Sequence, residues 1–84
     1  MILHVTATMD ESADPAPFRE EEHRVLEELR AEGTVLAAFR RHDRRGAFLV
    51  AEAADPADAR ARLGRLPFVA HGILTLEYTE VSPL

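Results

Sequence analysis

The sequence predicts an α+β domain in which four strands and two helices follow one another in the order β-α-β-β-α-β. Stretches with alternating apolar side chains, typical of strands, surround two stretches that begin with Asp-Pro, typical of helices. The two middle strands are joined by a short charged turn that ends in glycine, which favours an antiparallel hairpin. This split order is typical of the ferredoxin-like sandwich, in which two helices cover one face of four antiparallel strands.

The first helix is expected between Asp14 and Gly33, over the sequence DPAPFREEEHRVLEELRAEG. Asp14 can cap its first turn, and Pro15 suits the first helical position because its missing N–H would have no partner there. Gly33 suits the residue just past the end, where the backbone turns left-handed. At about 100° per residue, one face of this helix is apolar. It carries Phe18, Val25, Leu26 and Leu29.

Glu22 interrupts this apolar face of the first helix. It lies one turn after Phe18 and one turn before Leu26. A carboxylate among apolar side chains is costly unless it is paired or protonated. Glu22 is therefore the first candidate for a functional site.

The remaining elements are shorter, and their pattern leaves one sheet face uncovered. Alternation in the first strand sets Leu3 and Val5 on one face and His4 on the other. Because two helices cover one face only, we expect a homodimer in which two sheets pack face to face. Strands are expected over Ile2–Met9, Thr34–His42, Ala47–Ala53 and His71–Val81, a turn over Asp43–Gly46, a second helix from Asp55 to about Gly64, a connector at Leu66-Pro67-Phe68 and a tail at Ser82–Leu84.

Length and composition set limits on the class of protein. The 84 residues suffice for one domain, expected to span residues 1–84. A net charge of −5 opposes non-specific nucleic-acid binding, and no apolar run is long enough for a membrane span. The chain has no cysteine, no zinc-binding His spacing and no glycine-rich phosphate loop, so we expect neither a metal nor a cofactor. We expect a cytoplasmic protein.

Several short motifs share their spacing with a known family. They are Leu3-His4-Val5, Glu22, Glu32-Gly33-Thr34, Phe39-Arg40, Leu66-Pro67 and Ser82-Pro83. On these motifs the chain resembles the muconolactone delta-isomerase family of the dimeric α/β-barrel group. The segment after Leu66-Pro67, Phe-Val-Ala-His-Gly, looks closer to the related YciI-like proteins. The resemblance implies a dimer, or a larger ring, that acts on a small anionic substrate without a cofactor.

The resemblance also implies a reaction, the movement of a double bond within an unsaturated lactone. Such a reaction needs a group that takes and returns a proton and a cation near the carbonyl oxygen. Glu22 fits the first role because burial would raise its pKa, and Arg40 fits the second because it stays charged. His4 and His71 are further candidates for an acid, a base or a ligand contact. Glu22 and Arg40 can instead form a structural ion pair.

Two other functions remain open from the sequence. One is a non-catalytic module that binds a small ligand or completes a larger enzyme; it is favoured because the family's C-terminal His-Pro is replaced by Ser82-Pro83. The other is a cofactor-free monooxygenase of the same fold. With no Trp, one Tyr and four Phe, the chain has few rings to stack on an aromatic substrate.

Overall fold

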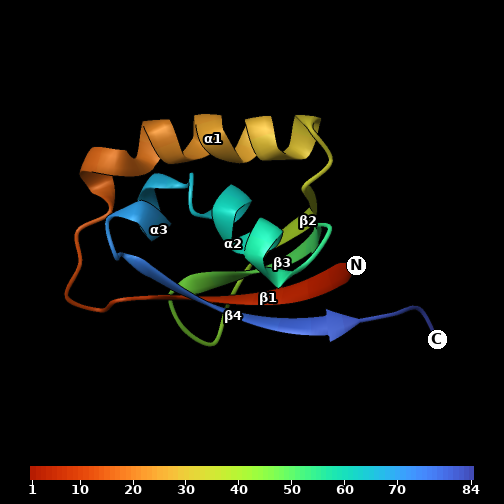
Figure 1. Cartoon of the computed structure of the whole chain (residues 1–84). Coiled ribbons are helices and arrows are strands. Elements are labelled where there is room, and N and C mark those ends of the chain that lie inside the picture. The colour runs from red at the N-terminus through yellow and green to blue at the C-terminus, as the bar shows by residue number, and fades with distance from the viewer.

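The computed structural model describes all residues, 1–84, as a four-stranded antiparallel sheet covered on one face by helices (Figure 1). This arrangement confirms the predicted ferredoxin-like α+β fold. The strand order is β2-β3-β1-β4. The elements in chain order are β1 (Ile2–Met9), the 3₁₀ turn η1 (Ala16–Phe18), α1 (Arg19–Ala31), β2 (Val35–Arg40), β3 (Gly46–Glu52), α2 (Pro56–Leu63), α3 (Pro67–Ala70) and β4 (Leu74–Val81).

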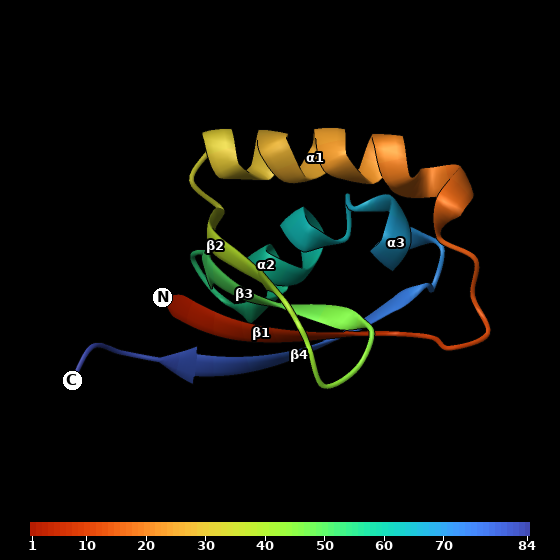
Figure 2. The ribbon, with the colours of Figure 1, turned by 180° about the vertical axis from the view of Figure 1, so that it is seen from behind.

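All three helices lie on the same side of the sheet, and the opposite side carries no element (Figures 1 and 2). The side chains of β1 follow the predicted alternation. Leu3 and Val5 are buried beneath the helices, whereas His4 and Thr6 lie on the uncovered face. None of the helices combines the length and the apolar character that a membrane span requires.

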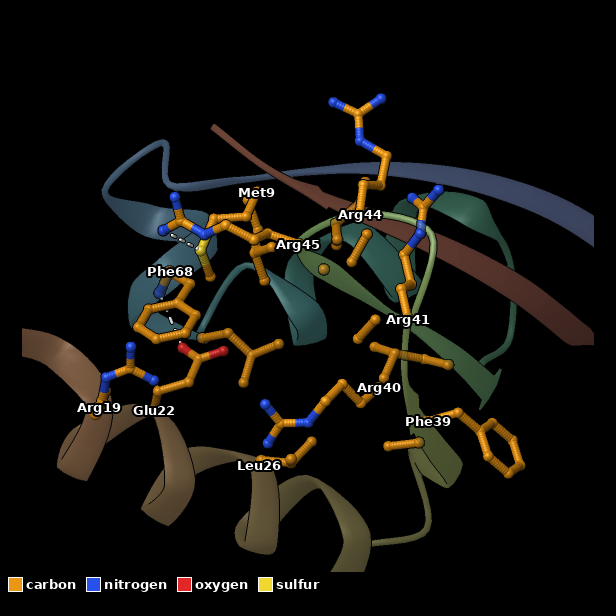
Figure 3. Close-up of a pocket in the computed structure, with 18 of the residues that line it drawn as sticks. Met9, Arg19, Glu22, Leu26, Phe39, Arg40, Arg41, Arg44, Arg45 and Phe68 are labelled. Atoms are coloured by element: carbon orange, nitrogen blue, oxygen red, sulfur yellow. Dashed lines mark hydrogen bonds between the residues drawn. The ribbon is translucent and has the colours of Figure 1, made fainter. Parts of the chain in front are cut away.

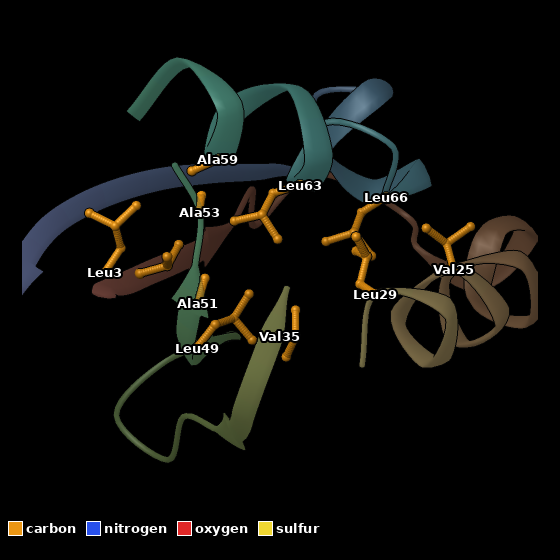
Figure 4. Packing of buried hydrophobic residues seen from close by; sticks show 11 residues of the cluster. Leu3, Val25, Leu29, Val35, Leu49, Ala51, Ala53, Ala59, Leu63 and Leu66 are labelled. Carbon is orange, nitrogen blue, oxygen red and sulfur yellow. The ribbon is translucent and has the colours of Figure 1, made fainter. Parts of the chain in front are cut away.

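The core lies between the helices and the sheet (Figure 4). Leu29 of α1 and Leu63 of α2 are fully buried there, which removes two large apolar side chains from water. The cluster contains Leu3, Val5, Val25, Leu29, Val35, Leu49, Ala51, Ala53, Ala59, Leu63 and Leu66.

The first helix begins differently from the prediction. Asp14 Oδ1 accepts a hydrogen bond from the N–H of Ala16 at 3.1 Å, so it does cap a turn. That turn is the 3₁₀ turn η1, closed by the Phe18 N–H donating to the Pro15 carbonyl at 2.9 Å. Phe18, with φ −110° and ψ −1°, separates η1 from the regular helix, which starts at Arg19. The predicted start at Asp14 is therefore wrong by one turn.

The predicted connector after the second helix contains the short helix α3. Pro67 occupies its first position, the place in a helix that favours proline. Gly72 then takes a positive φ of 71°, which reverses the chain before the last strand. β4 consequently begins at Leu74, and the prediction that it begins at His71 is wrong.

The hairpin between β2 and β3 is wider than predicted, since β2 ends at Arg40 and β3 begins at Gly46. Gly46 has a φ of 145°, and a Cβ atom there would lie 2.1 Å from the carbonyl oxygen of Ala7. The close approach of β3 to β1 at this point therefore requires glycine.

Candidate functional site

A cleft of about 700 Å³ opens between α1, α3 and the hairpin that joins β2 to β3 (Figure 3). Its apolar wall comes from the sheet and from α3, and its polar wall comes mainly from arginines. The cleft is lined by Ala7, Met9, Arg19, Glu22, Leu26, Arg30, Ala38, Phe39, Arg40, Arg41, His42, Arg44, Arg45, Gly46, Ala47, Leu49, Leu66, Phe68, Leu74 and Leu76.

One stripe of α1 forms a wall of this cleft. Arg19, Glu22, Leu26 and Arg30 follow one another at intervals of three, four and four residues, which places them on the same side of a helix. Glu22 thus lies between a cation and an apolar side chain. The same helix buries Val25 and Leu29 in the core, so the packing of α1 fixes the direction of the stripe.

Glu22 is half-buried and makes no ion pair. Its Oε1 accepts a hydrogen bond from the backbone N–H of Phe68 at 2.9 Å (Figure 3). Phe68 is the second residue of α3, where a backbone N–H has no partner within the helix. Burial raises the pKa of Glu22 above its ordinary value, and the Phe68 N–H opposes part of that rise. A carboxyl group with a raised pKa is a stronger proton acceptor than an ordinary glutamate, which suits Glu22 to proton transfer.

The cleft is strongly cationic although the whole chain carries a net charge of −5. Six of the ten arginines line it, and Glu22 is the only acidic residue among them. Arg40 extends from the end of β2 into the cleft, with its guanidinium directed towards Glu22 and Leu26 (Figure 3). Arg40 makes no ion pair with Glu22 or with another carboxylate. The structural ion pair that the sequence left open is therefore not formed within the chain. An anionic ligand is therefore favoured in this cleft.

Two of the lining arginines shape the rim. Arg41 pairs with Asp43 at 2.6 Å and donates to Thr8 Oγ1 at 3.0 Å. Arg45 donates to the carbonyl oxygens of Glu11 and Ala13, each at 3.2 Å, and so ties the loop after β1 to the hairpin. These two guanidinium groups already have partners and serve the structure of the rim.

The two candidate histidines do not line the cleft. The His4 ring stacks on Phe48 with ring centroids 5.7 Å apart, on the uncovered face of the sheet. The His71 ring stacks on Phe18 with centroids 4.3 Å apart, at the end of α3. The structure therefore brings together Glu22 and Arg40 but neither histidine. No group of three His, Asp or Glu side chains is placed to hold a metal ion.

Sequence reasoning missed Arg19 as a candidate for the site. The signal was present, because a residue three positions before Glu22 lies on the same side of the helix. Arg19 is exposed and makes no ion pair, so its charge is available to the cleft. The acidic residues beside Arg19 in the sequence suggest a solvated helix face, so the pattern did not single out Arg19.

The fold and the cleft define a ferredoxin-like α+β domain with a cationic pocket between its first helix and its sheet. The chain belongs to the YCII-related domain family, whose model matches residues 1–82. The YciI-like character expected from the segment after Leu66-Pro67 is thereby confirmed. None of the curated proteins matches the chain in sequence.

Two solved structures share this fold with the chain. Muconolactone isomerase superposes with a TM-score of 0.79 at 20% identity, over 100% of this chain and 91% of that one. The 5-chloro-2-hydroxyhydroquinone dehydrochlorinase TftG of Burkholderia phenoliruptrix AC1100, in complex with 2,5-dihydroxybenzoquinone, superposes with a TM-score of 0.80 at 15% identity, over 98% and 94%. The muconolactone isomerase-like fold is confirmed, and at these identities the likeness concerns the fold alone.

Proposed function

We propose that the cleft catalyses a proton transfer on a small, unsaturated, anionic ring compound without a cofactor, as an isomerase or a cyclase. One observation carries this proposal. Glu22 is half-buried, has a raised pKa and no ion pair, and is the only acidic side chain in a cleft lined by six arginines. A desolvated carboxyl group facing cations is suited to remove a proton from a carbon acid and to tolerate the anion that results.

The two walls of the cleft supply the proton-transfer group and the cation that this reaction needs. The free Oε2 of Glu22 takes a proton from a carbon beside the conjugated system. The electron pair of the broken C–H bond moves into the ring, and the carbonyl oxygen becomes negative. Glu22 then returns the proton to a different carbon, so the double bond shifts and no electron is gained or lost. Arg40 holds the anionic substrate during both transfers.

The names of the two structural neighbours support this substrate class. One is named for a lactone and the other for a chlorinated hydroquinone, and both compounds are small unsaturated rings. The resemblance of the sequence motifs to the muconolactone delta-isomerase family supports the same substrate class, because the motif residues Glu22 and Arg40 line the cleft.

The proposal is tested by hydrogen–deuterium exchange. Muconolactone and a panel of carboxylated butenolides are incubated with the protein in D₂O, and loss of the ring and allylic proton signals is followed by NMR. We expect exchange that falls about 100-fold or more in Glu22→Gln, the range of general acid–base catalysis. Glu20→Gln, an exposed change two positions away, serves as the matched control. Full exchange activity in Glu22→Gln would refute the mechanism.

A non-catalytic binding module is the second candidate. It is favoured by the absence of His4 and His71 from the cleft, which leaves Glu22 as the one acidic group there without either candidate histidine to assist it. Tight binding of butenolide acids without any proton exchange would support this reading. A monooxygenase is less favoured, because Phe68 supplies the only phenylalanine ring directed into the cleft, whereas the Phe39 ring points away from it (Figure 3).

We also propose that a second copy of the chain covers the open sheet face. Phe39 and Phe48 are register partners there, and Phe39 is 60% exposed. From the rim of the cleft, the Arg41 side chain reaches onto this face, where its guanidinium lies over the Phe48 ring. The side chain is only 9% exposed and already pairs with Asp43, so covering it would leave no unpaired guanidinium. An uncovered sheet with such side chains is suited to an isologous dimer.

A further inference from the structure

Two guanidinium groups approach Glu22 from different walls of the cleft. Arg19 lies three residues before Glu22 on α1, and Arg40 extends from the end of β2 on the opposite side (Figure 3). Neither of them makes an ion pair or a hydrogen bond with another side chain. Both are exposed, so neither is held by burial in the core. Each is free to bind an anionic group of a ligand.

The other arginines of the cleft are less suited to this role. Arg41 and Arg45 are engaged by Asp43 and by the carbonyl oxygens of the loop after β1. Arg44 is directed away from Glu22 (Figure 3). Arg30 pairs with Glu27 at 3.5 Å and lies about two helical turns beyond Glu22.

The positions of Arg19 and Arg40 relative to Glu22 differ. Side chains three residues apart on a helix have Cβ atoms about 5–6 Å apart, so Arg19 is a direct neighbour of Glu22. The guanidinium of Arg40 lies by Leu26, one turn further along α1 (Figure 3). In the reaction, the oxygen that becomes negative is two bonds from the α-carbon, to which Glu22 returns the proton. It must therefore lie close to Glu22, whereas a substituent of the ring can lie further along the cleft.

We infer that Arg19 and Arg40 bind different anionic groups of the substrate, Arg19 the enolate oxygen and Arg40 a carboxylate. This inference rests on the proposed function and deepens it. When Glu22 takes the proton, the C–H electron pair becomes a new carbon–carbon π bond. The π pair of the existing ring double bond moves one position towards the carbonyl carbon, and the carbonyl π pair moves to the oxygen beside Arg19. The carboxylate at Arg40 keeps its charge throughout. The substrate is thus a ring that carries both a conjugated carbonyl group and a separate carboxylate.

Two probes with the same five-membered lactone ring separate the two roles. Tetronate carries its negative charge on an enolate oxygen and has no carboxylate. The saturated lactone 5-oxotetrahydrofuran-3-carboxylate carries a carboxylate and no enolate. Binding of each is measured by isothermal titration calorimetry to the wild type, Arg19→Gln and Arg40→Gln. Arg44→Gln, which removes a rim charge directed away from Glu22, is the control for general electrostatic attraction.

We expect Arg19→Gln to weaken tetronate binding tenfold or more and to change binding of the carboxylate probe less than threefold. Arg40→Gln should have the opposite pattern, and Arg19→Lys should restore most of the tetronate affinity. On an exchanging substrate, Arg19→Gln should lower the rate at saturation, and Arg40→Gln should raise the concentration needed for half saturation. Equal losses for both probes, a reversed pattern, or no binding of tetronate to the wild type would overturn the inference.

The result is separable from the test of the proposed function. If the two probes fail to distinguish Arg19 from Arg40 while Glu22→Gln still abolishes proton exchange, the division of roles is wrong and the proton transfer stands. If Glu22→Gln exchanges protons as the wild type does, the proposed function is wrong and the inference falls with it. Circular dichroism and urea unfolding of each variant establish that the fold is intact.

Discussion

The backbone N–H of Phe68 donates a hydrogen bond to Oε1 of Glu22 at 2.9 Å, joining two residues 46 positions apart. The bond fixes one carboxylate oxygen against α3 and leaves the other oxygen to the cleft. Because α3 supplies this donor, the short helix takes part in the site although none of its side chains carries a charge. The position of Glu22 therefore depends on the packing of α1 against α3.

The first prediction concerns the pKa of Glu22, which burial raises above the ordinary value of 4.5. A raised pKa means that the folded state binds the proton more tightly than the unfolded state. This contribution to stability is complete below pH 4.5 and is lost as the pH rises through the raised value. Carbon-detected NMR of Glu22 should give a pKa above 4.5, with Glu22→Gln as the assignment control.

The same shift predicts how stability differs between the wild type and Glu22→Gln. Glutamine cannot ionise, so the variant should gain free energy of unfolding relative to the wild type as the pH rises above 4.5. Urea unfolding between pH 4 and pH 8 measures this difference. A difference that does not change with pH would show that the carboxyl group titrates alike in the folded and unfolded chains.

The second prediction concerns Asp43 in the hairpin. The Arg41 guanidinium, through a hydrogen bond, lowers the pKa of Asp43 from 3.8 to about 2. A lowered pKa contributes stability that is present above pH 3.8 and is lost as the pH falls through about 2. Asp43→Asn should therefore lower the midpoint of thermal unfolding at pH 7 and have little effect near pH 2. Equal effects at both pH values would assign the loss to packing rather than to charge.

The third prediction concerns Arg45, whose guanidinium ties the loop after β1 to the hairpin. Arg45→Ala removes donors to two carbonyl oxygens and should cost about 1 kcal/mol of unfolding free energy. It should also speed amide exchange in residues 10–13, as measured by NMR. Arg44→Ala, at the neighbouring position and without these bonds, is the control and should be within about 0.5 kcal/mol of the wild type. Equal behaviour of the two variants would contradict the role of Arg45.

Local patterns predicted most of the fold. Alternation placed β1 at Ile2–Met9, and the Asp-Pro start placed α2, where Asp55 Oδ1 accepts from the Asp58 N–H at 2.8 Å. Two of the errors lie near prolines, because proline suits both a turn and the first position of a helix. In the chain after Asp14, prolines lie in a 3₁₀ turn before the helix, and after Leu66 a proline begins a short helix where the sequence predicts a connector. Such choices depend on tertiary contacts that single-residue propensities do not contain.

The candidate site was predictable in part. Periodicity alone identified Glu22 as a carboxyl group on the apolar side of a helix, and the structure places it in the cleft with Arg40. The alternation of β1 sets His4 on the sheet face away from the helices. The same pattern therefore predicts that His4 and Glu22 lie on opposite sides of the sheet. The Phe68 N–H could not be predicted, because a backbone donor 46 positions away leaves no signal in the sequence.

The fourth prediction concerns the open sheet face. With a chain mass of 9.4 kDa, a dimer should appear as twice that mass in light scattering after size exclusion. Phe39→Glu and Val50→Glu each add a charge to the open face, where these residues lie on neighbouring strands β2 and β3. Both variants should elute as one chain, because a buried unpaired carboxylate opposes association. Ala57→Glu adds the same charge on the exposed surface of α2 and should leave the dimer intact. A wild type that stays monomeric at 100 µM, or a Phe39→Glu variant that remains dimeric, would show that another surface, or none, joins the copies.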